Sequence, residues 1–159
     1  MRRVILLLLA IIISACQAQA PTQSVDVDTL QAPATQCTTN CDRVVVDMTV
    51  RDNMFFSQRD VSVTTGQELA IDFVNTSRLP HNIVIVDGDM SVATDVNRDA
   101  INQADYMPQH PAAIAALPMT MPNQTGNLTW QPNQPGTYLY ICTYPGHFDA
   151  GMYGTITVK

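Results

Sequence analysis

Three sulfur- and nitrogen-bearing side chains near the end of the chain stand at a spacing that suits a metal ion. Cys142, His147 and Met152 follow one another with four residues between each pair, and another histidine, His81, lies far upstream. One thiolate, two imidazoles and one thioether are the ligand set of a blue copper site, in which soft sulfur favours Cu(I) and imidazole suits both oxidation states. The pattern therefore predicts one copper centre.

The surrounding residues are expected to bring these ligands together. Cys142 ends one predicted strand, Met152 begins the next, and His147 lies on the loop between them, where Pro and Gly favour a sharp bend. His81 stands at the start of another predicted strand. Taken singly, a buried thiol, a turn histidine and a core methionine are ordinary structural features. Their combination at this spacing favours copper.

Alternating apolar and polar residues predict an all-β domain. The predicted strands are Val44 to Val50, Val61 to Thr64, Leu69 to Asn75, Asn82 to Val86, Asn127 to Trp130, Thr137 to Cys142 and Met152 to Val158. Strands this short, separated by turn-forming residues, favour an antiparallel β-sandwich with Greek-key connections. Residues 89–126 interrupt the pattern and are expected to form a functional flap or partly helical insertion, with a short helix around Asn97 to Ala104.

Composition narrows the function further. Of 159 residues, 46% are hydrophobic and 14% charged, and the net charge is −6, which fits one modest acidic domain. No Lys/Arg run follows the first three residues, which argues against nucleic-acid binding. Three histidines are too few for a two-domain copper oxidase or for the second copper site of a nitrite reductase. Because protein ligands fill all four positions of the predicted site, we expect an electron carrier rather than an enzyme.

The N-terminus has the layout of an export signal. Arg2 and Arg3 precede an apolar run from Val4 to Ile13, which is followed by Ser14-Ala15-Cys16. The run is about half of the roughly 20 residues that a spanning helix needs. We expect residues 1–15 to be a lipoprotein-type signal and Cys16 to carry the lipid; plain secretion and an uncleaved anchor are the alternatives. Loss of both arginines leaves six basic and fourteen acidic residues, a net charge of −8.

Residues 16–42 are expected to form a flexible tether between the lipid and the folded domain of residues 43–159. From residue 17 to 36 the chain has no aromatic, glycine or basic residue, and it cannot bury enough apolar surface to fold alone. The protein should therefore be held at the outer face of a bacterial cytoplasmic membrane or in the periplasm. In such an oxidising compartment Cys37 and Cys41 are expected to form a disulfide, with a free or copper-handling thiol pair as the alternative.

The region 43–159 resembles the cupredoxins, the small type 1 blue copper proteins. Its segment CTYPGH resembles azurin, and the gap between His147 and Met152 is closer to that of the auracyanins. The resemblance implies an eight-stranded Greek-key fold with ligation through His81, Cys142, His147 and Met152. It also implies that the carbonyl of Pro80 lies near the opposite axial position and that residues 89–126 hold the flap.

Neighbours of the ligands are expected to organise the site. The amide of Asn82 can bond to Thr143, which would tie the two ligand segments together; an ordinary asparagine at a strand start is the alternative. Backbone N–H groups of Asn82 and Tyr144 are candidates to bond the sulfur of Cys142 and raise the reduction potential.

The expected partners are redox proteins, and the expected state is a monomer. His147 should emerge through an apolar surface formed by Leu79, Pro80, Pro145 and Phe148, a small patch suited to brief docking. The acidic surface favours a partner with a basic face, such as a c-type cytochrome, and a salt-sensitive association rate. The alternative function is a copper-binding and trafficking module. It rests on a second Cu(I) site in the flap, formed by Met107, His110, Met119 and Met121.

Overall fold

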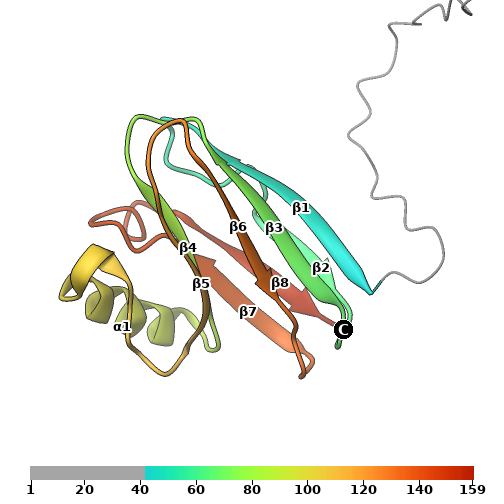
Figure 1. Cartoon of the computed structure of the whole chain (residues 1–159). Helices are drawn as coiled ribbons and strands as arrows, with labels where there is room; N and C mark the ends of the chain where they lie inside the picture. Colours follow the sequence, from blue (N-terminus) through green and yellow to red (C-terminus); the bar gives the residue numbers. More distant parts are fainter. Residues whose placement is uncertain (1–41) are drawn as a thin grey trace, which may run out of the picture. The chain divides into compact units, whose positions relative to one another are not determined.

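A computed structural model describes residues 42–159, which form a two-sheet β-sandwich (Figure 1). The strands are β1 (Arg43–Val50), β2 (Asp60–Val63), β3 (Glu68–Asn75), β4 (His81–Val86), β5 (Ala113–Thr120), β6 (Thr125–Trp130), β7 (Gly136–Ile141) and β8 (Tyr153–Val158). A helix, α1 (Met90–Ile101), and a short 3-10 turn, η1 (Ala104–Tyr106), lie between β4 and β5. The predicted all-β sandwich with a helical insertion is confirmed.

The strands are divided between a three-stranded sheet, in the order β1-β3-β6, and a five-stranded sheet, in the order β2-β8-β7-β4-β5. β1 runs parallel to β3, and β2 runs parallel to β8, whereas the other neighbours are antiparallel. The prediction of a wholly antiparallel sandwich is therefore wrong at these two pairs. The reason is that β2 belongs to the opposite sheet from β1 and β3, so β3 returns beside β1 in the same direction.

Strand β4 is buried on both faces and lies between β7 and β5 in the five-stranded sheet. Ile83 and Ile85 pack between the two sheets, in the main core cluster. Val84 and Val86 point the other way, into a second cluster that α1 closes with buried side chains including Val96. β4 therefore reads as a continuous apolar run because it carries a sheet on one face and a helix on the other.

The segment expected to be a flap is largely regular structure. α1 begins at Met90, seven residues earlier than predicted, because the side chain of Asp89 accepts hydrogen bonds from the backbone of Ser91 and Val92 and caps the helix. Gly88 permits this tight start: its φ is 153°, and a Cβ there would lie 2.6 Å from the Cβ of Val92. The prediction of a helix around Asn97 to Ala104 was therefore wrong in its bounds.

Strand β5 was missed altogether by the sequence prediction. Its sequence, AIAALPMT, is rich in alanine and contains a proline, both of which are uncommon in strands. β5 forms the edge of the five-stranded sheet, and proline is tolerated at an edge because it need not donate to a neighbour. Pairing with β4 thus decides the structure of this segment.

The topology gathers the predicted ligands at one end of the sandwich. β7 lies between β4 and β8, and Ile141 pairs with both Val84 and Tyr153. Because both pairings are antiparallel, the start of β4, the end of β7 and the start of β8 meet at the same end. His81, Cys142 and Met152 occupy those positions.

Within residues 42–159, no helix has both the length and the apolar character needed to cross a membrane. The predicted signal, the lipidated Cys16 and the predicted disulfide of Cys37 and Cys41 lie outside the described residues, as does nearly all of the predicted tether.

Candidate metal centre

The structure brings the four predicted ligands together in the protein interior. The Sγ of Cys142 lies 3.5 Å from the Nδ1 of His147 and 3.8 Å from the Nδ1 of His81, and the Sδ of Met152 lies 3.2 Å from the same His81 nitrogen. The potential ligand atoms of His81, Cys142 and His147 all lie within 4.8 Å of one another. All four residues are buried, and the least buried, His147, is 3% exposed.

These distances fit a single metal ion. Ligand distances near 2.1 Å for nitrogen and 2.3 Å for sulfur are typical of a divalent first-row metal such as zinc. Placed about 120° apart around one ion, such a nitrogen and sulfur would be about 3.8 Å from each other. The two sulfur-to-nitrogen distances observed are 3.5 and 3.8 Å. The three side chains could therefore hold an ion in a trigonal arrangement, with the thioether of Met152 as a further ligand.

The ligand loop is held in shape by its own backbone. Cys142 donates its N–H to the carbonyl of Met152, and Met152 donates in turn to the carbonyl of His147. His147 donates to the carbonyl of Tyr144, which closes the turn containing Gly146 at φ 82°. The site geometry is therefore set by the folded chain.

Burial leaves the free ligands uncharged near neutral pH. It raises the pKa of the Cys142 thiol to about 11, although hydrogen bonds from the backbone of Asn82 and Tyr144 act in the opposite direction. Burial, followed by the nearby His147, lowers the pKa of His81 to about 4, and burial also lowers the pKa of His147. Neutral imidazoles have their lone pairs ready for a metal ion, whereas the thiol must lose its proton on binding.

The lowered histidine pKa values predict that the metal-free protein loses stability in mild acid. The ordinary pKa of histidine is 6.5 and that of folded His81 is about 4. The unfolded chain therefore binds more protons between these values, so this stability is complete above pH 6.5 and falls as the pH is lowered towards 4. For His81 the slope should approach about 1.4 kcal/mol per pH unit, and His147, whose pKa is also lowered, should act in the same direction. Urea unfolding of the metal-free protein across this range measures it.

The matched comparison is the metal-free His81→Gln variant. It lacks one of the two titrating groups, so its unfolding free energy should fall less steeply between pH 6.5 and 4 than that of the unmodified protein. Equal slopes for the two proteins would contradict a lowered pKa at His81.

The expected link between Asn82 and Thr143 is present. The Nδ2 of Asn82 donates to the Oγ1 of Thr143 at 2.7 Å, and the N–H of Thr143 donates to the Oδ1 of Asn82 at 2.8 Å. Both residues are fully buried. The pair therefore joins the residue after His81 to the residue after Cys142. The backbone N–H groups of Asn82 and Tyr144, which were expected to bond the sulfur of Cys142, are hydrogen-bonded to that sulfur.

The insertion between β4 and β5 also contacts this link, which the sequence prediction missed. The carbonyl of Tyr106 accepts a hydrogen bond from the Oγ1 of Thr143 at 2.6 Å, and its ring packs against the ring of Tyr144 at 5.5 Å. Asp105 and Tyr106 both have φ of 54°, a left-handed conformation that is costly for residues other than glycine. Two successive positive φ values thus direct the Tyr106 carbonyl towards the ligand loop.

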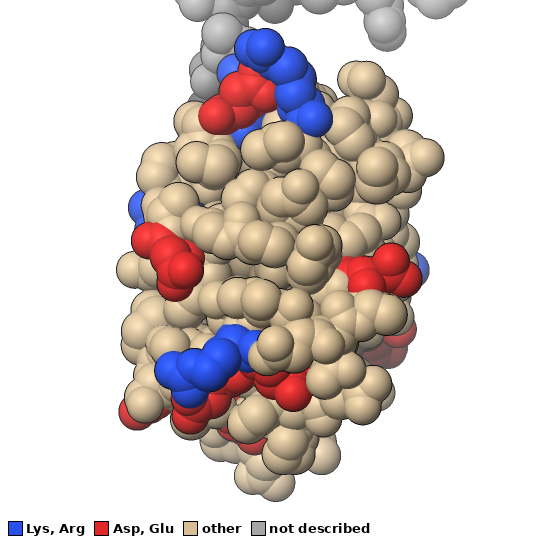
Figure 2. Space-filling view, turned by 90° about the vertical axis from the view of Figure 1, so that its left-hand side faces the viewer, with Lys and Arg blue, Asp and Glu red and all other residues tan. Residues whose placement is uncertain are grey.

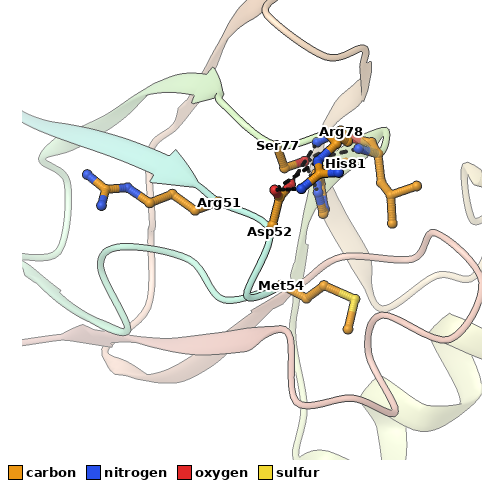
Figure 3. Close-up of a pocket in the computed structure, with 7 residues that line it drawn as sticks. Arg51, Asp52, Met54, Ser77, Arg78 and His81 are labelled. Atoms are coloured by element: carbon orange, nitrogen blue, oxygen red, sulfur yellow. Dashed lines mark hydrogen bonds and ion pairs between the residues drawn. The ribbon is translucent and has the colours of Figure 1, made fainter.

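A second unpredicted contact lies on the other side of His81. The Oγ of Ser77 lies 2.8 Å from the Nε2 of His81 and 2.9 Å from the Oδ1 of Asn75. Ser77 and His81 also line a pocket of about 270 Å³ that opens to the surface beside the site (Figure 3). The available sequence signal was the spacing N-x-S-x-x-x-H, because Ser and Asn after a strand commonly bond neighbouring groups.

The residues predicted to form the apolar docking surface differ in their exposure. Leu79 and Pro145 are exposed and Pro80 is half-buried, but Phe148 is 7% exposed and packs in the second core cluster with Tyr153. Its predicted place on the docking surface is therefore wrong, because α1 covers the apolar face to which it belongs. The Pro80 carbonyl as an axial group stays a prediction.

The residues of the alternative Cu(I) site differ in their burial and in their neighbours. The Sδ of Met107 lies 3.8 Å from the Nδ2 of Asn82, beside the buried site, whereas Met121 is one of the exposed apolar residues. His110 uses its Nδ1 to accept a hydrogen bond from the backbone of Ala112. A second copper site in this segment stays a prediction.

Known proteins are similar to part of this chain in sequence. Auracyanin-B of Chloroflexus aurantiacus is 42% identical over 113 residues, which are 67% of this chain and 48% of that protein. Auracyanin-A of the same organism is 32% identical over 113 residues, covering 68% and 69% of the two chains. The chain thus matches about half the length of the first relative.

Solved structures that resemble this chain also include auracyanins. The dithionite-reduced auracyanin of Roseiflexus castenholzii superposes with a TM-score of 0.69 at 37% identity, over 72% of this chain and 96% of that one. Residues 43–159 match the family model of copper-binding proteins of the plastocyanin/azurin family. With the buried ligand set and the two-sheet fold, these similarities show that the chain belongs to the plastocyanin/azurin family of blue copper proteins.

Proposed function

We propose that this protein carries single electrons between redox partners of a respiratory or photosynthetic chain. The observation that supports this most directly is the convergence of Cys142, His147, His81 and Met152 in one buried cluster. A bound copper ion would supply the Cu(I)/Cu(II) couple. The chain would supply all four ligands, which leaves no position for a substrate and favours electron transfer over catalysis.

The residues around the ligands suit a change of charge with little movement. The loop from Cys142 to Met152 is closed by its own backbone hydrogen bonds, and the link between Asn82 and Thr143 joins it to β4. The buried surroundings keep water from the ligands. A rigid, dry site lets an electron arrive or leave without large rearrangement.

The surface at the ligand end is expected to receive the partner. Leu79 is 42% exposed and lies two residues before His81, and Pro145 is exposed two residues before His147. Residues 106–148, which include the ligand loop as far as His147, contain no Asp, Glu, Lys or Arg; Asp149 follows. On the face in Figure 2, small groups of charged side chains are separated by broad uncharged surface. Such a surface suits a short-lived encounter with a redox protein such as a c-type cytochrome.

The charges near His81 differ from the acidic net charge of the whole chain. The chain is acidic overall, but the pocket beside His81 is lined by Arg51, Asp52 and Arg78, of which the last two form a salt bridge of 3.0 Å. Long-range attraction to a basic partner remains part of the proposal, because the whole-molecule charge acts at a distance. Close docking would depend on the apolar residues between these charges.

We expect Leu79→Asp to slow electron exchange with a soluble c-type cytochrome by about tenfold, with an unchanged visible spectrum. The reason is that a carboxylate at this position must lose its hydration shell, or hold the partner away, when the partner docks on the apolar surface that includes Leu79. Stopped-flow mixing of the reduced copper protein with oxidised cytochrome measures the rate. Voltammetry of both proteins tests for an unchanged reversible one-electron couple.

The matched control is Met90→Asp. Met90 is 41% exposed. His81 begins β4, whereas Met90 follows the other end of this strand. An aspartate in the first turn of α1 is favourable for the helix. This variant should exchange electrons at the unmodified rate. Equal slowing by both substitutions would point to net charge and contradict docking at Leu79.

We further propose that the protein is exported and held at the outer face of the membrane by a lipid on Cys16. The proposal rests on the signal-like N-terminus and the Ser14-Ala15-Cys16 ending. Intact mass of the protein purified from a bacterial host that processes lipoproteins provides the test. A mass equal to residues 16–159 plus lipid supports the proposal, whereas residues 16–159 without lipid, or an uncleaved chain, would overturn it.

A further inference from the structure

The feature of interest is a chain of buried polar side chains that reaches the ligand His81 from behind. Asn75 is the last residue of β3, Ser77 follows it on the loop, and His81 begins β4. The three residues are at most 5% exposed. A buried polar group destabilises the folded protein unless its hydrogen bonds are satisfied. Each donor in this chain must therefore face an acceptor, which fixes the direction of every bond.

The amide of Asn75 has a single consistent orientation. Its Nδ2 lies 2.8 Å from the carbonyl of Leu79 and 2.8 Å from the carbonyl of Thr120, and both of these groups can only accept. The Oδ1 of Asn75 is therefore the acceptor on the other side, where the N–H of Ser77 donates to it at 3.0 Å. Asn75 thus presents a fixed acceptor to the Ser77 hydroxyl.

The hydroxyl of Ser77 has one proton, and its surroundings direct that proton away from His81. Its Oγ lies 2.9 Å from the Oδ1 of Asn75 and 3.1 Å from the carbonyl of Leu79. Both of these oxygens can only accept. The hydroxyl proton must therefore point towards them, because otherwise their lone pairs would face the lone pairs of Oγ with no proton between. The lone pairs of Oγ then accept from the N–H of Leu79 at 3.2 Å and from His81 at 2.8 Å.

We propose that Ser77, oriented by Asn75, is a positioning residue of the copper site that holds His81 with its proton on Nε2 and its Nδ1 lone pair facing the metal position. The contacts of Nδ1 agree with this tautomer, because the atom faces the sulfurs of Cys142 and Met152. Figure 3 shows Ser77 and His81 next to each other among the residues that line the pocket. The hydroxyl therefore does for this histidine what a second hydrogen-bonding partner does in many metal sites.

The arrangement has two consequences for the metal. A fixed ring orientation reduces the rearrangement needed when copper binds, which raises affinity. Donation from Nε2 makes the imidazole a stronger electron donor, which favours Cu(II) over Cu(I). Loss of the Ser77 hydroxyl should therefore weaken Cu(II) binding by 10- to 100-fold, the usual effect of removing such a partner, and raise the reduction potential.

This inference rests on copper ligation by His81, which the proposed function also requires. The two are separable, because the unmodified protein must first show the absorption of a blue copper site. If it does not, the proposed function fails, whatever Ser77 does. The test of Ser77 then uses the metal-loaded full-length protein and a readout that is independent of electron transfer.

The first measurement needs no substitution. In the Zn(II)-loaded unmodified protein, ¹H–¹⁵N NMR of the histidine rings should show a proton on the Nε2 of His81 that exchanges slowly with water. The Ser77→Ala protein should lose this protection and bind Cu(II) 10- to 100-fold more weakly in competition with a chelator. Ser77→Thr retains a hydroxyl and should keep both properties.

The control is Thr76→Ala. Thr76 is on the same loop, and its Oγ1 donates to the carbonyl of Val50 at 2.7 Å, not to His81. It should leave the Nε2 proton protected and the potential unchanged. A rapidly exchanging Nε2 proton in the unmodified protein would overturn the proposal. So would a Ser77→Ala protein whose Cu(II) affinity and potential match those of the Thr76→Ala protein.

Discussion

The Cys142→Ser protein, loaded with Cu(II), is expected to lack the intense visible absorption of the unmodified protein. That absorption arises from charge transfer between a thiolate and copper, and Cys142 is the one cysteine among the described residues. Its sulfur lies 3.8 Å from the Nδ1 of His81 and 3.5 Å from the Nδ1 of His147. A serine oxygen is harder than thiolate and should also favour Cu(I) less. Visible spectroscopy with a copper count tests this.

A matched variant is Met152→Leu, which removes the weak axial ligand and leaves the thiolate in place. It should retain the intense absorption and change the reduction potential, because the axial ligand tunes that potential. Retention of the colour by Cys142→Ser would refute the blue copper site. Two tightly held Cu(I) ions per chain that survive loss of Cys142 would instead favour the trafficking function.

Replacing Asn82 by alanine should destabilise the metal-free protein by about 3 to 5 kcal/mol. The substitution removes two buried hydrogen bonds to Thr143, of 2.7 and 2.8 Å, each contributing about 1 kcal/mol. It also leaves the buried N–H of Thr143 without that acceptor, at a cost of about 1 to 3 kcal/mol. Urea unfolding followed by circular dichroism measures the free energy.

The control for this substitution is Asn127→Ala. Asn127 also donates from its side chain to another strand, to the Oδ1 of Asp72 on β3, but this pair is exposed. Exposed substitutions usually change stability by less than about 0.5 kcal/mol. The Asn82→Ala protein should in addition release copper faster, because the segments carrying His81 and Cys142 are no longer joined. Equal stability losses for the two variants would contradict this role of Asn82.

Local patterns in the sequence were sufficient for part of the fold. β1, β3 and β8 alternate or run apolar over six to eight residues, so their positions could be predicted from side-chain period alone. β5 could not, because its alanines and proline have low strand propensity and its structure depends on pairing with β4. The start of α1 was missed because its N-cap, Asp89, follows Asp87 and Gly88, which are also residues typical of turns.

For the site, the sequence by itself determined the ligand types. Cys142, His147 and Met152 lie within eleven residues, and their chemistry identifies a soft metal whatever the surrounding fold. His81 could be proposed as their partner because few histidines were available. Its approach to Cys142 depends on β4 and β7 being antiparallel neighbours, a long-range pairing that local periodicity does not contain.

The tertiary structure alone decided what surrounds the ligands. The hydrogen bond between Ser77 and His81 spans the connection from β3 to β4, and the one from Thr143 to the carbonyl of Tyr106 joins the ligand loop to the insertion. Their existence depends on distances and burial that arise only when both sheets and the insertion pack together. Ligand identity is a property of side-chain chemistry and can be read along the chain, whereas ligand orientation is a property of the packed interior.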